Sequence, residues 1–188
     1  LKHSNKGLPA AIWSAGSGKF GSKMKWAGID EIVIEGKSSS PVLIVIEDGA
    51  TGPEVALSPA ESLLGKDTHE KILALHAEYS DAHFAVIGPA GENYTNCYFA
   101  AVAMSTENEL KSRDDKCRFA GRGGMGTIMG SKNLIGFVAR SADKLTKLAS
   151  ETKELNKKIA QGVGSTKFRE ANKGGLGGTW SNFPILHE

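Results

Sequence analysis

The sequence predicts an α+β fold, because β-rich runs and amphipathic helical segments follow one another in mixed order along the chain. Its 188 residues are enough for one domain with a sizeable core, and 40% of them are hydrophobic, as in globular proteins. Glycine is frequent, at 23 residues, and it clusters at 16–28, 121–130, 162–164 and 174–178. Clustered glycine predicts tight turns and close approach of the backbone to a neighbouring group.

Five runs have the composition of β-strands, being rich in β-branched and aromatic residues. They are residues 29–36, 42–49, 83–87, 98–104 and 134–140. The turn-forming residues KSSSP separate the first two runs, so we expect these two to form a hairpin. The polar segment STENELKSRDDK after the fourth run is predicted to be a loop.

Four helical segments are predicted, at residues 67–80, 126–132, 141–162 and about 165–172. The first opens on the capping-box pattern DTHE, in which Asp67 and Glu70 satisfy free backbone amides. The third begins at Ser141, ends at Gly162 and carries four apolar residues at helical spacing. These residues are Leu145, Leu148, Leu155 and Ile159.

Charge and cysteine content exclude several classes of protein. The net charge of +2, with a pI near 8.5, is too small to indicate binding to nucleic acid or to a membrane surface. Cys97 and Cys117 lie outside any C-x-x-C pair, so no zinc or iron–sulfur ligand set is visible, and we interpret them as free buried thiols rather than a disulfide. Without a signal peptide or an apolar run of about 18–20 residues, the chain is expected to be cytoplasmic.

The stretch CRFAGRGGMGTIMGSKN, residues 117–133, matches the dinucleotide-binding spacing G-x-G-x-x-G at Gly121, Gly123 and Gly126. That motif requires a strand before the first glycine and an acidic residue at a strand end about 20 positions later. Here the preceding residues are polar, and Asp143 falls in the first turn of a predicted helix. Both requirements fail, so a dinucleotide is not expected.

The stretch Gly16-Ser17-Gly18-Lys19 resembles the end of a phosphate-binding P-loop. The full motif requires a glycine where Trp13 stands and a serine or threonine where Phe20 stands. The P-loop interpretation therefore fails at both positions.

Arg118 and Arg122 flank Gly121, and Gly123-Gly124 follow. Backbone amides freed by glycine, beside fixed positive charge and a helix N-terminus, form an anion site. Arginine adds geometry suited to phosphate. The alternative is a glycine-rich turn with solvated arginines, and the spacing alone does not decide between the two.

RFAGRGGMGTIMGSKNL at 118–134 resembles a segment of the tungsten-containing aldehyde:ferredoxin oxidoreductase family, whose usual form is close to RAAGRGGxGAVMGSKNLKA. Three further segments resemble the same family, in the family's order. They are FGSKMKWAGIDEIVIEGK at 20–37, GKDTHE at 65–70 and IGPAGEN at 87–93. The resemblance covers roughly residues 8–140, and residues 141–188 match only loosely.

The resemblance implies that residues 1–140 are an N-terminally incomplete cofactor-binding domain of two mixed or antiparallel β-sheets with flanking helices. This domain would form the base for a tungsten (or molybdenum) bis-pterin cofactor. Residues 141–188 would be a helical connection to missing downstream domains. The whole enzyme would oxidise aldehydes to carboxylic acids and pass electrons through a [4Fe–4S] cluster, bound outside this chain, to ferredoxin.

The resemblance also implies the contacts at the glycine turn. Arg118, Gly121 and Arg122 would contact pterin phosphate, with Gly123 in the same turn. The backbone carbonyl of Phe119 would ligate the magnesium that bridges the phosphates. No catalytic residue is expected in this chain, and its partners would be the remaining domains or subunits, with a homodimer left open.

A second contact segment is implied at WSAGSGKFG, residues 13–21, where the family has a form like MANSGGYFG. Ala15, Ser17 and Gly18 would face the cofactor, and the backbone carbonyl of Ala15 would be a second magnesium ligand. Ala15 replaces the usual asparagine and Ser17 a glycine. Because the family's contacts here are largely through the main chain, the resemblance still implies these contacts despite the two substitutions.

Two other functions compete with this one. The same cofactor could serve another substrate, as in an aromatic acyl-CoA reductase, but that branch tends to have GDKGL where this chain has GSKNL at 130–134. A protein of another class, a non-catalytic anion- or nucleotide-binding module, could use the same glycine–arginine turn. Bound tungsten and pterin would distinguish an enzyme that uses this cofactor from such a module.

Several other side chains are expected to be structural rather than functional. Glu92 is expected to fix the GPAGEN turn rather than act as a general base. The lysines near the proposed cofactor base, Lys19 and Lys23, are expected to be solvated rather than to neutralise phosphate. Trp13 and Phe20 are expected to pack in the core rather than to wall the pterin. His69, His76 and His83 are expected to lie at the surface or at the core edge rather than to bind a metal.

Overall fold

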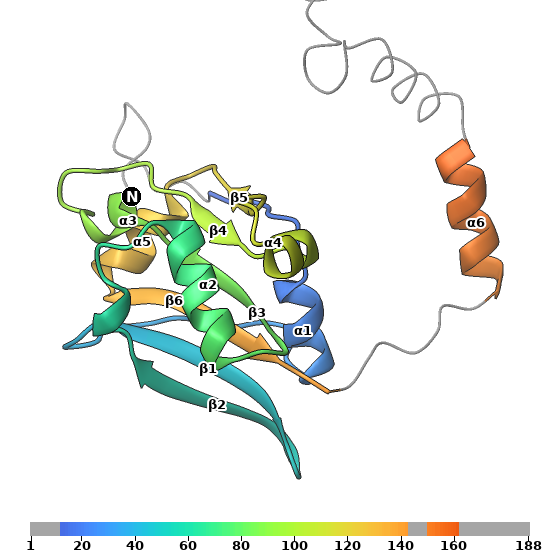
Figure 1. Cartoon of the computed structure of the whole chain (residues 1–188), viewed down its shortest axis with the longest axis horizontal. Coiled ribbons are helices and arrows are strands. Elements are labelled where there is room, and N and C mark those ends of the chain that lie inside the picture. Colours follow the sequence, from blue (N-terminus) through green and yellow to red (C-terminus); the bar gives the residue numbers. More distant parts are fainter. Residues whose placement is uncertain (1–11, 143–149, 162–188) are drawn as a thin grey trace, which may run out of the picture. The chain divides into compact units, whose positions relative to one another are not determined.

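The computed structural model describes residues 12–142 and 150–161, and the chain divides into two units, Leu1–Lys144 and Leu145–Glu188. The first unit contains a six-stranded sheet in the order β2-β1-β6-β3-β4-β5, with helices packed around it (Figure 1). The α+β class is confirmed. The expectation of two sheets is not met within the described residues, which form one sheet.

The strands are β1 (Val42–Gly49), β2 (Gly52–Pro59), β3 (Ala82–Ile87), β4 (Val102–Met104), β5 (Arg118–Ala120) and β6 (Leu134–Arg140). The helices of the first unit are α1 (Phe20–Trp26), the 3-10 turn η1 (Glu61–Leu63), α2 (Thr68–Glu78), α3 (Pro89–Glu92), α4 (Glu107–Ser112) and α5 (Met125–Ser131). The second unit contains α6 (Ser150–Gln161). Among these described helices, none combines the length and the apolar character that crossing a membrane requires.

The predicted hairpin of 29–36 with 42–49 is wrong. Residues 29–36 contain no strand, and β1 pairs antiparallel with β2 instead, with Gly49 opposite Gly52. The loop between β1 and β2 has only two residues, Ala50 and Thr51, so closing this hairpin orders fewer residues than the predicted one. The sequence signal for β2 was weak, because residues 52–57 are all exposed and the strand contains two prolines.

Other elements follow local patterns more closely. The strand over 134–140 and the short helix near 126–132 are confirmed, the latter shifted by one residue to Met125–Ser131. The strand over 83–87 is confirmed with one residue more, whereas that over 98–104 is reduced to its last three residues. The helix opening at DTHE is confirmed, and both hydrogen bonds of its capping box form between Asp67 and Glu70.

The predicted loop after β4 contains helix α4, which begins with a second capping box between Thr106 and Glu109. Strand β5 was also not predicted, since three residues carry too little pattern to be recognised. Helix α6 covers part of the segment predicted over 141–162, and residues 143–149 and 165–172 lie outside the described residues.

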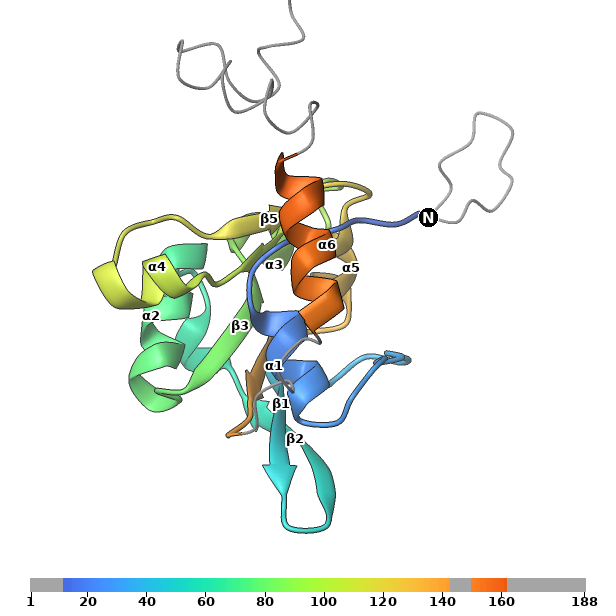
Figure 2. The same ribbon diagram turned by 90° about the vertical axis from the view of Figure 1, so that its right-hand side faces the viewer.

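Helices cover both faces of the sheet. Phe20 of α1 stacks on Phe137 of β6, with ring centroids 5.7 Å apart, and His76 of α2 meets the edge of Phe84 of β3 at 6.4 Å. Phe84 pairs with Val138, the neighbour of Phe137, so the two aromatic contacts lie on opposite faces. Figure 2 shows α1 and α2 on opposite sides of the sheet.

Glu107 at the start of α4 connects α1, α4 and β3. Its carboxylate lies 2.9 Å from the ammonium group of Lys19, 3.1 Å from that of Lys111 and 3.5 Å from Nε2 of His83. The hydrogen bonds from Lys19 and Lys111 hold the pKa of Glu107 at about 2, below its usual value of 4.5. Lys19 is therefore neutralised by a protein carboxylate.

We expect Glu107→Gln to lower the free energy of unfolding by about 1 kcal/mol at pH 7, a value reduced for solvent screening because the side chain is 38% exposed. Because the folded pKa lies below the unfolded value, the carboxylate stabilises the fold above pH 4.5 and loses this effect as the pH falls toward 2. Urea unfolding at several pH values would measure the effect. The control is Glu61→Gln, since Glu61 makes no ion pair with the described residues, and an equal loss in both variants would contradict the prediction.

Candidate functional site

The structure brings the segment 12–18 alongside the glycine turn. The backbone amide of Arg122 donates to Oγ of Ser14 at 3.0 Å. Two residues further along, Gly16 packs against Ala120, where an added Cβ would lie 3.5 Å from the Ala120 Cβ. These two contacts run antiparallel, so Ala15 between them lies close to residues 119–121. Two regions separated by about a hundred residues of sequence, each singled out by its glycines, are thus neighbours in the fold.

The glycine turn connects edge strand β5 to helix α5. Gly123 and Gly124 have φ of 69° and 66°, in the left-handed region, and Gly124 is the N-cap of α5. Added side chains would also collide, at Gly123 with Ile12 and at Gly124 with the carbonyl oxygen of Tyr98. Since α5 has only seven residues, an anion at this turn would depend on the arginines and the amides of the turn more than on the helix dipole.

Two positive charges beside the turn are available. Arg118 and Arg122 are exposed, and neither guanidinium makes an ion pair or a side-chain hydrogen bond within residues 12–142 and 150–161. By contrast, Arg140 pairs with Glu47 at 2.8 Å, and Nζ of Lys23 donates to the backbone carbonyl of Ser141 at 2.8 Å. Of the cations singled out from the sequence, the two arginines of the turn remain free to bind an anion.

Space over the turn lies at Gly121. A Cβ at this position would meet no atom within 4 Å, and its φ is not in the left-handed region. Nothing in the described chain therefore requires glycine there. A group approaching the backbone from outside would require it, so the turn fits a phosphate bound directly against the main chain.

Four large exposed aromatic side chains occur in the chain near the turn. They lie on the three segments that contact it, and their exposed fractions are 72% for Trp13, 62% for Tyr98, 73% for Phe99 and 53% for Phe119. The predicted core position of Trp13 is wrong, whereas Phe20 is buried as expected. Exposed aromatic clusters of this kind mark surfaces that bind a ligand or another part of a protein.

A buried ion pair joins α2 to α3, the helix that packs on α5. Lys71 is fully buried, donates to the carbonyl of Ile87 at 2.8 Å and pairs with Glu92, whose other oxygen accepts from the amide of Gly65 at 2.9 Å. Glu92 is thus engaged in holding α3, as expected, rather than free to act as a base. The GKDTHE and GPAGEN segments, separate in sequence, meet where the amide of Gly65 donates to Glu92.

Helix α3 in turn packs directly on α5. A Cβ on Gly130 would overlap the backbone carbonyl of Gly91, so the two backbones are in contact. The hydroxyl of Thr127 donates to the carbonyl of Cys97 at 2.9 Å and accepts from the amide of Ala100 at 3.1 Å. Together these contacts fix α5, the turn before it and the aromatic segment 97–100.

The three histidines within residues 12–142 do not converge on a metal site. His69 contacts Glu109 at 3.0 Å, His83 contacts Ser105 at 2.9 Å, and His76 packs against a buried aromatic ring. Burial lowers the pKa of His83, and the nearby carboxylate of Glu107 opposes this shift. Within the described parts of the chain, no three residues among histidine, cysteine, aspartate and glutamate gather where they could hold a metal ion. A metal at the glycine turn would need backbone carbonyls or a ligand of its own.

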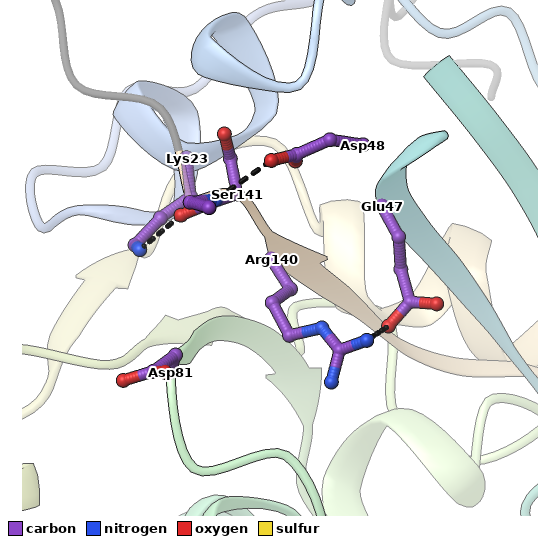
Figure 3. Close-up of a pocket in the computed structure, with 7 residues that line it drawn as sticks. Lys23, Glu47, Asp48, Asp81, Arg140 and Ser141 are labelled. Carbon is purple, nitrogen blue, oxygen red and sulfur yellow. Dashed lines mark hydrogen bonds and ion pairs between the residues drawn. The ribbon is translucent and has the colours of Figure 1, made fainter. Parts of the chain in front are cut away.

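A cavity of about 540 Å³ lies at the other end of the sheet from the glycine turn. It opens where β1 and β6 end and β3 begins (Figure 3). Its charged lining is mostly satisfied by the protein. Besides the pairs of Arg140 and Lys23, the amide of Ala142 donates to Asp48 at 2.7 Å. This cavity has neither the glycine backbone nor the free cations of the turn, so the turn is the better candidate site.

The expectation that no strand precedes Gly121 is wrong, because β5 ends at Ala120, but the fold gives another reason against a dinucleotide. Strand β5 has three residues and pairs antiparallel with β4 at the edge of the sheet. The dinucleotide fingerprint follows a strand inside a parallel sheet, so the glycine spacing occurs here in a different structural setting.

The chain resembles known proteins along most of its length. Residues 10–141 match the family described as aldehyde ferredoxin oxidoreductase, N-terminal domain. The chain is 38% identical over 165 residues to a tungsten-containing aldehyde ferredoxin oxidoreductase of Pyrococcus abyssi, a match covering 82% of this chain and 24% of that protein. It is 40% identical over 119 residues to the protein of the same name from Pyrococcus furiosus, covering 62% and 17%.

A more distant relative is the WOR-like subunit of an aliphatic sulfonate oxidoreductase of Pyrococcus furiosus, 29% identical over 153 residues and covering 76% and 22% of the two chains. Among solved structures, the active-site complex BamBC of benzoyl coenzyme A reductase, with bound 1,5-dienoyl-CoA, is similar with a TM-score of 0.60 and 26% identity. That match covers 85% of this chain and 21% of the other. The chain spans about a quarter or less of the length of the curated relatives it matches.

Proposed function

Because this chain belongs to the aldehyde ferredoxin oxidoreductase family and matches its N-terminal domain, we propose that residues 1–140 form the base that binds a tungsten (or molybdenum) bis-pterin cofactor. Residues 141–188 would lead into the remaining domains or subunits of the enzyme. The observation that carries the proposal is the glycine turn itself, where two free arginines and open backbone lie against the segment 12–18. These features suit a phosphorylated ligand held against the main chain.

The two arginines hold the pterin phosphates in this proposal. Arg118 and Arg122 donate charge-assisted hydrogen bonds from their guanidiniums. The backbones of Gly121 and Gly123 allow the phosphate to approach the main chain. The open space at Gly121, beside the two free arginines, leaves room for this approach, because a Cβ there would meet no protein atom within 4 Å.

The backbone carbonyls of Ala15 and Phe119 would hold a magnesium ion, which would supply positive charge beside the phosphates. Oxygen ligands suit this hard cation. The antiparallel contacts of Ser14 with Arg122 and of Gly16 with Ala120 bring these two backbone segments close together. Ser17 and Gly18 would complete the contacts of the first segment with the cofactor.

In the whole enzyme, we propose that aldehydes are oxidised to carboxylic acids and that electrons leave through a [4Fe–4S] cluster, bound outside this chain, to ferredoxin in the cytoplasm. The metal centre supplies the redox chemistry when it is bound. This chain supplies binding, orientation and positive charge for the cofactor's phosphates. The residues that exchange protons with the substrate would belong to the remaining domains.

A second candidate is reduction of an aromatic acyl-CoA on the same cofactor base. It is supported by the structural similarity to the benzoyl coenzyme A reductase complex. The higher identity to aldehyde ferredoxin oxidoreductases, 38% against 26%, favours the aldehyde branch. Viologen-dye assays with aldehydes and with an aromatic acyl-CoA would distinguish the two.

Gly121→Ala in the enzyme that contains this chain tests the cofactor site. We expect the added methyl group to push the phosphate away from the backbone and to lower the affinity for the cofactor roughly 5–150-fold, and with it the pterin and tungsten content, since such overpacking costs roughly 1–3 kcal/mol. The free energy of unfolding should change by less than about 0.5 kcal/mol, because the Cβ meets no protein atom.

The matched control is Gly21→Ala on α1, where a Cβ also meets nothing within 4 Å. It should leave both the cofactor content and the fold unchanged. Tungsten is measured by elemental analysis and pterin by fluorescence after oxidative release. Full tungsten and pterin content in Gly121→Ala would show that the phosphate is not bound at this turn.

A further inference from the structure

Ser14 anchors the segment 12–18 to the glycine turn. Its Oγ accepts a hydrogen bond from the backbone amide of Arg122 at 3.0 Å. Among residues 12–142 and 150–161, no strand pairing, backbone hydrogen bond or ion pair involves the segment, so this contact is the one hydrogen bond that holds it there. Ser14 is half-buried, whereas Trp13 and residues 15–18 are exposed. The hydrogen bonding between the segment and the turn therefore depends on this hydroxyl.

The hydroxyl proton of Ser14 has no acceptor in the described part of the chain. A serine hydroxyl has one proton to donate and two lone pairs that accept. One lone pair takes the amide of Arg122, and no oxygen or nitrogen within the described residues accepts the proton. A hydroxyl that accepts one hydrogen bond becomes a better donor of the next, because each bond polarises the other. Ser14 therefore offers a strengthened donor beside the turn.

This donor lies next to the open backbone of the turn. Gly121 directly precedes the amide to which Ser14 is bonded, and an added Cβ on Gly121 would meet no atom within 4 Å. The stretches 12–18 and 118–124 together contain two arginines and no aspartate or glutamate. Neither guanidinium makes an ion pair within the residues that the structure describes. A group that enters this space thus meets hydrogen-bond donors and positive charge, without a competing carboxylate from either stretch.

We propose that Ser14 is a further binding residue of the site, whose hydroxyl donates to an oxygen of the bound phosphate while its Oγ accepts from the amide of Arg122. The main chain of the turn then reaches the ligand through the serine as well as directly. The inference rests on the proposed function of the turn and deepens it. It adds a neutral side-chain donor to the two guanidiniums that the proposed function already names.

The hydrogen bonding also specifies the class of ligand. The hydroxyl of Ser14 and the guanidiniums of Arg118 and Arg122 all offer donors, so the ligand must supply acceptors and negative charge. A phosphate monoester supplies three acceptor oxygens, enough for one contact with each of the three side chains, whereas a carboxylate supplies two. The site is therefore better suited to a terminal phosphate group than to a carboxylate.

The contact belongs to this chain rather than to the usual family pattern. In the family form MANSGGYFG, alanine stands at the position of Ser14 and asparagine at that of Ala15. The polar side chain is thus shifted by one position, from 15 to 14. Because the hydroxyl of Ser14 is bonded to the turn, this shift gives the segment a contact with the amide of Arg122 that an alanine side chain cannot make.

Ser14→Ala in the enzyme that contains this chain tests the proposal. We expect the affinity for the cofactor to fall roughly tenfold, and with it the tungsten and pterin content, because a hydrogen bond to a charged group is lost. Ser14→Thr keeps a hydroxyl and should retain the content. The matched control is Ser22→Ala on α1, since Ser22 is also half-buried and its side chain makes no hydrogen bond within residues 12–142 and 150–161. Full content in Ser14→Ala, or an equal loss in Ser14→Thr, would overturn the proposal.

Ser14→Asp separates the donor from the anchor. Its carboxylate can accept from the amide of Arg122 but has no proton to donate and repels a phosphate. We therefore expect slow deuterium exchange of that amide together with a loss of cofactor at least as large as in Ser14→Ala, while the buried amides of β3 stay protected in every variant. Full cofactor content in Ser14→Asp would overturn the proposal.

Gly121→Ala shows which of the two proposals fails. Loss of cofactor in Gly121→Ala with full content in Ser14→Ala would overturn the role of Ser14 alone. Full content in both variants would overturn the phosphate site at the turn as well.

Discussion

Replacing Lys71 by alanine is expected to lower the free energy of unfolding by about 3–5 kcal/mol, the typical cost of breaking a buried ion pair from one side. The ammonium group is fully buried, and its removal leaves the carboxylate of Glu92 and the carbonyl of Ile87 without their partner. Urea unfolding followed by circular dichroism measures the loss. Stability within about 1 kcal/mol of the unsubstituted chain would show that the pair is not a main support of the fold.

Lys66→Ala is the control for this experiment. Lys66 lies five residues earlier, and its ammonium group bonds the exposed backbone carbonyl of Ser62. Removing it should change the stability by less than about 0.5 kcal/mol. The double variant Lys71→Met with Glu92→Gln should recover part of the loss, because it removes both charges from the interior.

Arg122→Ala in the complete enzyme is expected to lower cofactor affinity by roughly 10–100-fold, since a hydrogen bond to a charged group contributes about 1.5–3 kcal/mol. Arg122 has no other partner in the described residues, and its backbone is already held by Ser14. The fold should therefore survive. Tungsten and pterin content per protein, measured after purification without added cofactor, reports the loss.

Arg122→Lys should restore only part of the affinity, because a lysine cannot make the paired contact of a guanidinium. Lys111→Ala on α4 removes one positive charge from a side chain that is 77% exposed and should leave the cofactor content unchanged. Equal losses of cofactor content in Arg122→Ala and Lys111→Ala would show that the loss comes from the change in net charge and not from a specific contact of Arg122. Full cofactor content in Arg122→Ala would make Arg122 a solvated surface residue and leave the phosphate to Arg118 and the backbone amides.

The contrast between the two predictions follows from burial. Lys71 stabilises the fold because its ammonium group is buried and its hydrogen-bond partners cannot bond to water in its place. Its removal therefore lowers the free energy of unfolding. Arg122 is exposed and contributes nothing that the described fold requires, so its loss appears in ligand binding alone. A variant that lost both cofactor and stability would not separate these roles. Substitutions at Gly123 or Gly124 would do this, because both positions have left-handed φ and no room for a side chain, so Gly121→Ala and Arg122→Ala are better probes of the site.

The sequence alone determined what depends on local pattern. The capping box at Asp67 and Glu70, the short helix after the glycine turn and the strand at 134–140 each follow from residues near one another in the chain. The family was also recognisable from the sequence, because several segments in a fixed order are far more specific than one glycine spacing. The arginines beside the turn were visible as a candidate anion site for the same reason.

The tertiary structure decided everything that depends on partners distant in sequence. It paired β1 with β2 rather than with 29–36, because a two-residue loop closes at less cost in entropy and the buried face of 29–36 packs on the core. It neutralised Lys19 through Glu107 while leaving Arg118 and Arg122 free, a difference that no spacing reveals. It also placed the segment 12–18 beside the glycine turn. Long-range contacts of this kind are selected by packing and hydrogen bonding across the whole domain, whereas a sequence pattern reports only the preferences of neighbouring residues.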